Sequence, residues 1–419
     1  MSGAAISPAP LLTTSDGVPL KVSLRRAERK NRLRSLSLVL PLLIFVIASF
    51  VVPLAGMLWR AVDNPEVRAT LPATLAALES WDGKATPDEA VFAALAEDLR
   101  KSQAARTTGL VGKRINYELP AARSTFLKAA RVVDKTDHGP WKPLFTAADP
   151  FWNSVEFWTI LKRNGAPLTP YYLLNSLDLK QDTGGSITPV APDQAIFLDI
   201  FTRTLWISLL VTLATLVLGY PIAHLMAVLP PKSANLLMIL VLLPFTTSIL
   251  VRTTSWVVLL QTNGLINDVL VALHLTGERL QLIFNRAGTI VAMTHIQLPF
   301  TVLPIYSVMK SIPGNHVRAA RSLGAGPFYS LWSVYVPQTL PGVGAGCLLT
   351  FILSLGYYIT PALVGGPQDQ MVSYFVALYT NRELNWGQAA ALGAVLLTIT
   401  LVLYAAFNRL VGIDKVKLG

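Results

Sequence analysis

Apolar residues gather in long blocks along the chain, separated by polar stretches. Each block is about 20 residues long, the length that an α-helix needs to cross roughly 30 Å of hydrocarbon at about 1.5 Å per residue. Six blocks can be recognised, at about residues 37–59, 205–227, 236–260, 288–310, 341–364 and 389–411. The pattern predicts an all-α integral membrane protein with six transmembrane helices.

The composition supports a membrane protein. The chain has 419 residues, of which 52% are hydrophobic and 14% charged, and its mean hydropathy is +0.49. So few charged residues cannot cover the surface of a soluble domain. The net charge of +11 could suggest nucleic acid, but the basic residues collect in the N-terminal arm and in short loops beside the apolar blocks. We therefore expect a lipid bilayer, and no nucleic acid, as a partner.

The ends of the chain indicate its orientation. Residues 1–34 are polar and basic, which predicts a disordered cytoplasmic tail. The apolar block at 35–59 is too long for the core of a signal peptide, so we expect it to be a retained first transmembrane helix. Alternation then places Lys232, residues 310–321 and the tail 412–419 on the cytoplasmic side, where short basic loops are favoured.

Residues 60–197 have the composition of a soluble domain, with nearly balanced charge. Apolar residues recur at helical spacing in 87–99 and 121–133, whereas 182–186 and 189–192 are typical of turns. Long domains cross the membrane largely regardless of their charge. We expect a large, mainly helical extracytoplasmic insert between the first two transmembrane helices.

The insert contains three tryptophans, Trp141, Trp152 and Trp158, that have two explanations. They belong to the core of a folded domain, or they lie along the membrane surface, where Trp is enriched.

The sequence shows no recognisable motif for nucleotide binding, metal binding or nucleophilic catalysis. No G-x-x-x-x-G-K-[ST] loop is present, so the chain does not bind ATP by that route. The single cysteine, Cys347, lies in an apolar block and can form neither an intrachain disulfide nor a thiolate cluster. No metal-ligand cluster or nucleophile triad stands out. We expect no catalytic residue, metal or cofactor in this chain.

The loop at about 311–337 is the most informative segment. Asn315 can cap a first short helix, Gly324 can end it in a left-handed conformation, and Pro327 suits the start of a second helix. The second helix should stop near Pro337. A compact, gently amphipathic helix of this kind fits a groove on a partner protein.

This loop resembles the signature of type I ABC importer permeases, which reads EAA, three residues, G, nine residues, then I-x-L-P. The chain has Ala319-Ala320, Gly324 and Val334-Tyr335-Val336-Pro337 at the same spacing. The resemblance covers about residues 200–411 and the first span, and is greatest to permeases for spermidine and putrescine. Further similar segments are 243–245, 250–253 with Trp256, 263–267 and 298–304.

The resemblance implies a bacterial inner-membrane permease with a core at 198–411 and both termini in the cytoplasm. It implies three kinds of partner: a second permease subunit, a cytoplasmic ATPase dimer that binds ATP and Mg, and a periplasmic substrate-binding protein. The loop would be a coupling helix that docks on the ATPase. By this resemblance, we expect the following residues to couple the permease to the ATPase: Asn315, Arg318, Ala319, Ala320, Leu323, Gly324 and Pro337.

Arg318 departs from the family pattern, which has a glutamate at this position. If Asn315 is the cap, residue 318 is the third helical position, where glutamate would complete a capping box and favour the helix dipole. We expect arginine to weaken the helix start by up to about 1 kcal/mol, unless the ATPase supplies an acidic partner.

Four residues in or near the apolar blocks are candidates for a translocation path: Arg252, Trp256, Tyr357 and Tyr358. An arginine inside a span indicates function, but it can also snorkel to the membrane surface. Aromatic side chains can bind a cation, but they also anchor spans at the interface. His224 and His295 could line a path or form contacts between helices, and we expect the contacts.

The spans contain almost no carboxylates, and Asp199 lies just outside them. Polyamine cargo would require acidic groups, which the partner permease could supply. Opines, amino-acid derivatives and ferric iron are alternative cargoes. A membrane-embedded enzyme would need convergent ionisable groups, and a secondary transporter would show inverted repeats of broken helices; neither pattern is evident.

Overall fold

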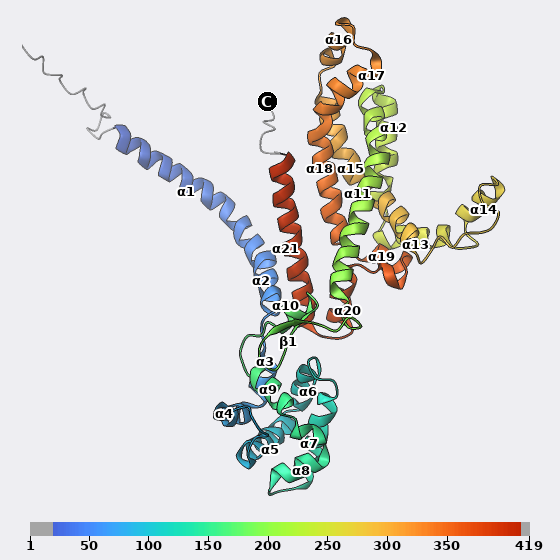
Figure 1. Cartoon of the computed structure of the whole chain (residues 1–419). Coiled ribbons are helices and arrows are strands. Elements are labelled where there is room, and N and C mark those ends of the chain that lie inside the picture. The colour runs from blue at the N-terminus through green and yellow to red at the C-terminus, as the bar shows by residue number, and fades with distance from the viewer. Residues whose placement is uncertain (1–19, 412–419) are drawn as a thin grey trace, which may run out of the picture. The chain divides into compact units, whose positions relative to one another are not determined.

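The structure, a computed structural model, describes residues 20–411. It divides into two units, Met1–Trp59 and Arg60–Gly419, which are described separately. The described part of both units is mainly helical, and one two-stranded sheet lies in the second (Figure 1). The prediction of an all-α membrane protein is therefore confirmed.

The first unit is a helix with one π turn. It consists of α1 (Leu20–Val46), the π turn η1 (Ile47–Val51) and α2 (Val52–Trp59). The wide π turn lies just before Pro53, whose missing N–H and bulky ring disturb ordinary helical bonding. Residues 20–34 belong to α1, so the prediction of a disordered tail is wrong for them. Adding residues to an existing helix is favourable because it needs no new nucleus. Residues 1–19 lie outside the described part.

The second unit begins with the insert, which is mainly helical, as expected. In chain order it contains α3 (Pro65–Thr70), α4 (Pro72–Glu79), α5 (Glu89–Ala104), α6 (Thr108–Asn116), α7 (Ala122–Lys135), α8 (Trp141–Ala148), the 3-10 turn η2 (Pro150–Asn153), α9 (Val155–Arg163) and α10 (Tyr171–Asn175). An antiparallel hairpin of β1 (Leu179–Gln181) and β2 (Ile187–Pro189) follows. The predicted turn at 182–186 joins its strands.

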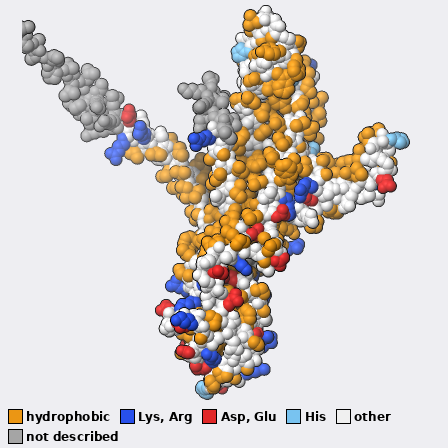
Figure 2. Space-filling model, in the orientation of Figure 1, with side chains coloured by type: hydrophobic (Ala, Val, Ile, Leu, Met, Phe, Trp, Pro, Cys, Tyr) orange, Lys and Arg blue, Asp and Glu red, His pale blue; other side chains and the backbone are white. Residues whose placement is uncertain are grey.

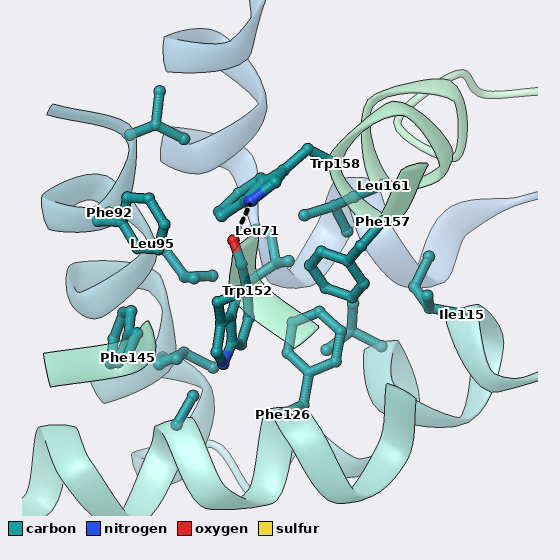
Figure 3. Close-up of a cluster of buried hydrophobic side chains, with 14 of the residues drawn as sticks. Leu71, Phe92, Leu95, Ile115, Phe126, Phe145, Trp152, Phe157, Trp158 and Leu161 are labelled. Atoms are coloured by element: carbon teal, nitrogen blue, oxygen red, sulfur yellow. Dashed lines mark hydrogen bonds between the residues drawn. The ribbon is translucent and has the colours of Figure 1, made fainter. Parts of the chain in front are cut away.

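An aromatic core holds the insert together (Figure 3). Trp152 and Trp158 are fully buried, and the Trp158 Nε1–H donates to the Trp152 carbonyl oxygen at 2.9 Å. Phe92 lies between α8 and α9, with its ring 5.0 Å from that of Trp158. Trp141 is also buried. The tryptophans are therefore core residues, and the alternative that they lie along the membrane surface is wrong.

The chain enters and leaves the helical part of the insert side by side. Asp63 and Leu168 form an antiparallel bridge, and the Asn64 N–H donates to the Pro167 carbonyl oxygen at 3.1 Å. The aromatic core contains only residues between 67 and 161. Helices α3–α9 therefore have an apolar core of their own on a paired stem. Polar contacts also tie them to the rest of the unit: Lys113 donates to the Glu383 carbonyl oxygen at 2.6 Å, and Arg163 to that of Asp182 at 2.8 Å.

The remainder of the second unit is a helical bundle with short connecting helices (Figure 1). In chain order it contains α11 (Phe197–Val228), α12 (Pro231–Leu242), η3 (Leu243–Thr246), α13 (Ile249–Leu260), α14 (Leu265–Ala272), α15 (Arg286–Ser311), α16 (Asn315–Ser322), α17 (Pro327–Ser330), η4 (Leu331–Tyr335), α18 (Val336–Leu355), α19 (Ile359–Val364), η5 (Pro367–Asp369), α20 (Val372–Asn381) and α21 (Trp386–Val411). Hydrophobic side chains cover most of the visible bundle surface, whereas charged ones are frequent on the insert (Figure 2).

Helices α11, α15 and α18 form the centre of the bundle. The Thr301 hydroxyl on α15 bonds both Thr215 on α11, at 2.9 Å, and Thr350 on α18, at 2.6 Å. A Cβ on Gly346 would lie 2.7 Å from the Thr301 carbonyl oxygen, so only glycine allows α18 to approach this closely. Small residues and hydroxyl pairs are the usual means of packing helices in a membrane.

Five helices among residues 20–411 are long and apolar enough to cross a membrane. They are Glu28–Trp59, α11, α15, the continuous helix Pro327–Leu355 and Trp386–Arg409 of α21. A sixth crossing exists only if Pro231–Thr246 and Ile249–Ala272, which bend by 99°, count as one span. The count of six is thus reached only with a broken helix.

Two of the predicted spans are each divided into two helices. The block at 236–260 breaks after Pro244, and the Ser248 hydroxyl caps α13 by accepting from the Val251 N–H at 3.2 Å. The block at 341–364 also divides, because α18 ends at Leu355 and α19 begins at Ile359. Hydropathy detects apolar residues but not a change in chain direction.

Candidate coupling and translocation sites

The start of α16 differs from the prediction. Gly314, not Asn315, is the capping residue, and Asn315 is the first residue of the helix. The Arg318 N–H donates to the Gly314 carbonyl oxygen at 3.3 Å, which makes residue 318 the fourth helical position. A glycine cap has no side chain, so no capping box can form with residue 318. The expected penalty for arginine through a lost box is therefore wrong.

The end of α16 agrees with the prediction. Gly324 has a φ of +90°. Its N–H donates to the Arg321 carbonyl oxygen at 3.0 Å, and the Ala325 N–H donates to that of Ala320 at 3.1 Å. This pair of bonds is a Schellman motif, in which a left-handed glycine satisfies the last carbonyl groups of a helix. Leu323, just before the glycine, is 89% exposed.

The second helix of the loop begins at Pro327, as predicted, but does not stop near Pro337. It continues through η4 into α18 as one helix that ends at Leu355. The π turn at Leu331–Tyr335 precedes Pro337 and accommodates its ring and missing N–H. The loop is thus mechanically continuous with a bundle helix.

The tip of the bundle near α16 exposes large apolar side chains. Phe328 is 74% exposed and Trp332 56%, and their rings lie 6.1 Å apart. On its other side, α16 packs through Val317 against the apolar core formed by α11 and α15. Asn315, Arg318 and Ala319 are exposed. An exposed apolar patch with a basic rim is typical of a protein interface.

Arg252 and Trp256 lie one turn apart on α13 and face neighbouring polar and aromatic groups. The Trp256 Nε1–H donates to the His295 Nδ1 on α15 at 3.1 Å. The Arg252 guanidinium lies 6.0 Å from the Phe245 ring, which packs edge-on against Phe300 at 4.9 Å. The Arg252 Nε is buried without a hydrogen-bond partner among the described residues.

The two tyrosines of the predicted path lie in the connection between α18 and α19. Tyr357 packs against a cluster that includes Met293 and Met371. Tyr358 is 41% exposed, and its ring lies 6.3 Å from that of Tyr374. The structure therefore places Arg252 and Trp256 on one helix, α13, which a hydroxyl bond between Thr253 and Thr360 joins to α19, just after the two tyrosines. A translocation path along these residues stays a prediction.

Sequence reasoning missed the contacts that join the insert to the bundle. The Asp178 carboxylate accepts the N–H groups of Ile196, Phe197 and Leu198 at 3.1, 3.0 and 2.7 Å, and so caps α11. A second contact involves the buried Gln388 amide on α21, which bonds Asn175 and Ser176 at 3.0 Å each. An aspartate at variable distance before an apolar block gives no recognisable signal.

A buried arginine stiffens the insert beside this joint. Arg114 is 1% exposed, donates to Asn64 at 2.9 Å and pairs with Glu118 at 2.9 Å. Its guanidinium also lies 5.2 Å from the Tyr172 ring. Burial, followed by the charge of Glu66, raises the pKa of Tyr117 to about 12, so this phenol stays neutral.

The family model for binding-protein-dependent transport system inner membrane components matches residues 196–412. The chain belongs to this family. It is 31% identical over 230 residues to the spermidine/putrescine transport system permease protein PotB of Haemophilus influenzae, covering 53% of this chain and 80% of that protein. It is 30% identical over 226 residues to PotB of Escherichia coli, covering 53% and 82%. The protein is thus a transport permease of an inner membrane rather than an enzyme.

Among solved structures, a bacterial ABC transporter that imports alginate matches with a TM-score of 0.41 and 18% identity, over 53% of this permease and 80% of that chain. The family match begins at residue 196, so it contains α11–α21 and leaves the insert outside.

Proposed function

We propose that this permease is a subunit of an ATP-driven importer and that α16 is its coupling helix. The observation that carries the proposal is the geometry of residues 314–327 within a chain of this family. A short helix with defined ends at Gly314 and Gly324 exposes Leu323 and Phe328 beside basic residues. Such a helix fits a groove on a cytoplasmic ATPase.

The connections of α16 explain how a movement would reach the bundle. On one side α16 follows α15 after three residues, and on the other α17 continues into α18. Thr301 links α15 to α18 and to α11 through its two hydroxyl bonds. Closure of the ATPase dimer on ATP and Mg would therefore move three central helices together, as alternating access requires.

The proposed assembly contains a second permease subunit, the ATPase dimer and a periplasmic substrate-binding protein. The end of the bundle that carries α16 would face the cytoplasm, because Lys232, Lys310, Arg318 and Arg321 follow the positive-inside pattern. Both chain termini would lie on that side. The insert, at the other end of α11, would then lie in the periplasm.

We propose spermidine and putrescine as the cargo, because the two PotB relatives carry these names. Two carboxylates at the insert end of the bundle are already paired, Asp199 with Arg203 and Asp369 with Arg286 at 3.0 Å, while Glu383 is exposed in the connection between α20 and α21. Recognition of a polyamine would therefore need further acidic groups from the second permease or the binding protein.

A cargo that carries a carboxylate is the second candidate, and Arg252 favours it. A buried guanidinium nitrogen without a partner inside an apolar bundle is a natural site for an anion. Opines and amino-acid derivatives have such a group.

Uptake into vesicles that contain the permease pair, the ATPase and the binding protein tests both candidates. We expect ATP-dependent uptake of spermidine or putrescine, with ATPase activity stimulated by the loaded binding protein. Uptake of an opine or amino-acid derivative instead, abolished in Arg252→Gln, would support the second candidate. No stimulation by any loaded binding protein would contradict the importer proposal.

A further inference from the structure

A cavity of about 450 Å³ lies beneath α16, between α11, α15 and the start of α17. Apolar side chains, including Val317 and Leu331, form much of its wall. Two exposed cationic side chains, Lys310 and Arg321, and the His224 imidazole complete the lining. Among residues 20–411, no aspartate or glutamate lines it.

The nearby segments of the chain contain no carboxylate that would balance the positive charge of this cavity. Residues 200–267 and 279–368, which include every residue that lines the cavity, contain no aspartate or glutamate. Like charges gathered in a partly enclosed site repel one another, and an anion relieves that repulsion. The negative ends of α11 and α15 amount to about half a charge each and offset only part of it.

His224 adds a polar group that is unsatisfied. Its Nδ1 is buried and has no hydrogen-bond partner among the described residues, while its ring packs edge-on against Tyr335 at 5.2 Å. Leaving a buried nitrogen without a partner is unfavourable. An oxygen-rich anion in the cavity would provide the missing partner.

We propose that this cavity binds a phosphate-bearing anion, and that an anionic phospholipid headgroup is its main source. In the orientation proposed above, the cavity lies on the cytoplasmic side, where basic pockets between transmembrane helices suit such headgroups. Two apolar residues of the wall, Val228 and Leu331, are 60% and 37% exposed and give acyl chains a surface to follow. A bound headgroup would hold α16 against the bundle through Arg321.

A carboxylate of the ATPase is a less suitable occupant. The exposed apolar side chains Leu323, Phe328 and Trp332 mark the outer face on which a globular partner would dock. The cavity lies instead under Val317, on the side of α16 that packs against the bundle. Inorganic phosphate has the right chemistry but lacks the apolar chains.

Native mass spectrometry of the full chain in detergent tests the proposal without depending on transport. Phosphatidylglycerol, phosphatidylcholine and inorganic phosphate are the probes. We expect phosphatidylglycerol to bind in preference to phosphatidylcholine, and Lys310→Gln to weaken that binding about fivefold. Lys232→Gln is the matched control, because it removes a lysine near the same end of the bundle from outside the cavity lining.

Each possible result of this experiment leads to a different conclusion about the occupant of the cavity. Displacement of the lipid by phosphate would support the phosphate site and make free phosphate a second source. Equal binding of the two lipids, or equal effects of the two substitutions, would overturn the proposal. So would loss of phosphatidylglycerol on addition of the ATPase, which would identify a partner carboxylate as the occupant. Unchanged lipid binding in Lys310→Gln, even with a lower melting temperature, would also overturn the proposal.

Discussion

At Gly324 the chain has a left-handed backbone, and no atom lies within 4 Å of the place where a Cβ would be. A larger side chain there would therefore meet no clash but would strain the backbone by about 1–2 kcal/mol. Asparagine tolerates this conformation better than other residues. The position thus separates an effect of backbone geometry from an effect of side-chain bulk.

We predict that Gly324→Val lowers transport and cargo-stimulated ATPase activity together, whereas Gly324→Asn retains most of both. The reason is that valine disfavours the Schellman turn that ends α16 and positions α17. Membrane levels of the two variants provide the control for assembly. Normal activity of the valine variant at normal levels would show that this turn does not transmit the ATPase movement.

Arg114 gives a second prediction at the residue scale. Arg114→Met should destabilise the insert by about 3 kcal/mol, because it breaks a buried ion pair and leaves Asn64 without its donor. Arg131→Met, on the exposed side of α7, is the matched control. Protease sensitivity of residues 65–166 in increasing urea measures the difference. Equal sensitivity of the two variants would mean that the pair contributes no net stability.

Local chemistry explains which residue roles could be predicted. Gly324 and Pro327 were recognised because a left-handed helix end and a first helical position each require one particular residue type. Asn315 was misassigned because several residues near it can begin a helix. The choice depends on where α15 ends, which the sequence of the loop does not specify.

At the scale of elements, the long apolar blocks predicted helices correctly but not their continuity. The α12–α13 break and the uninterrupted α17–α18 helix both involve prolines, Pro244 and Pro337. A proline removes one hydrogen bond in each case. Packing then determines whether the chain turns or a π turn absorbs the proline, and packing involves residues far away in the sequence.

Contact between α10 and α21 yields the next prediction. A Cβ on Gly387 would overlap the Tyr172 ring, whereas a Cβ on Gly393, in the same helix, would meet no atom within 4 Å. Gly387→Ala should therefore separate the two helices and speed hydrogen exchange in residues 171–176, while Gly393→Ala should not. Identical exchange in both variants would indicate that the joint between insert and bundle adapts without cost.

At the scale of the whole molecule, the sequence predicted a folded insert, but its attachment could not be foreseen. The stem pairs Asp63 with Leu168, and the joint pairs Ser176 with Gln388, which lie far apart in the chain. Such contacts leave no periodic pattern. The joint matters for function because Asp178 caps α11, so the insert is fixed to the start of a central helix.

Excision of the α3–α9 domain tests the role of the insert. Replacing residues 65–166 by a short Gly-Ser linker joins two points that are already hydrogen-bonded, Asn64 and Pro167, and keeps the Asp178 cap and the Gln388 contacts. We predict unchanged membrane insertion and basal ATPase activity but loss of transport driven by the binding protein, because the domain would touch that protein or shape the entrance. Unaltered transport would make the domain dispensable, and loss of basal activity would assign it to the stability of the bundle. Cleavage of the intact domain by protease added from the cytoplasmic side would overturn the proposed orientation itself.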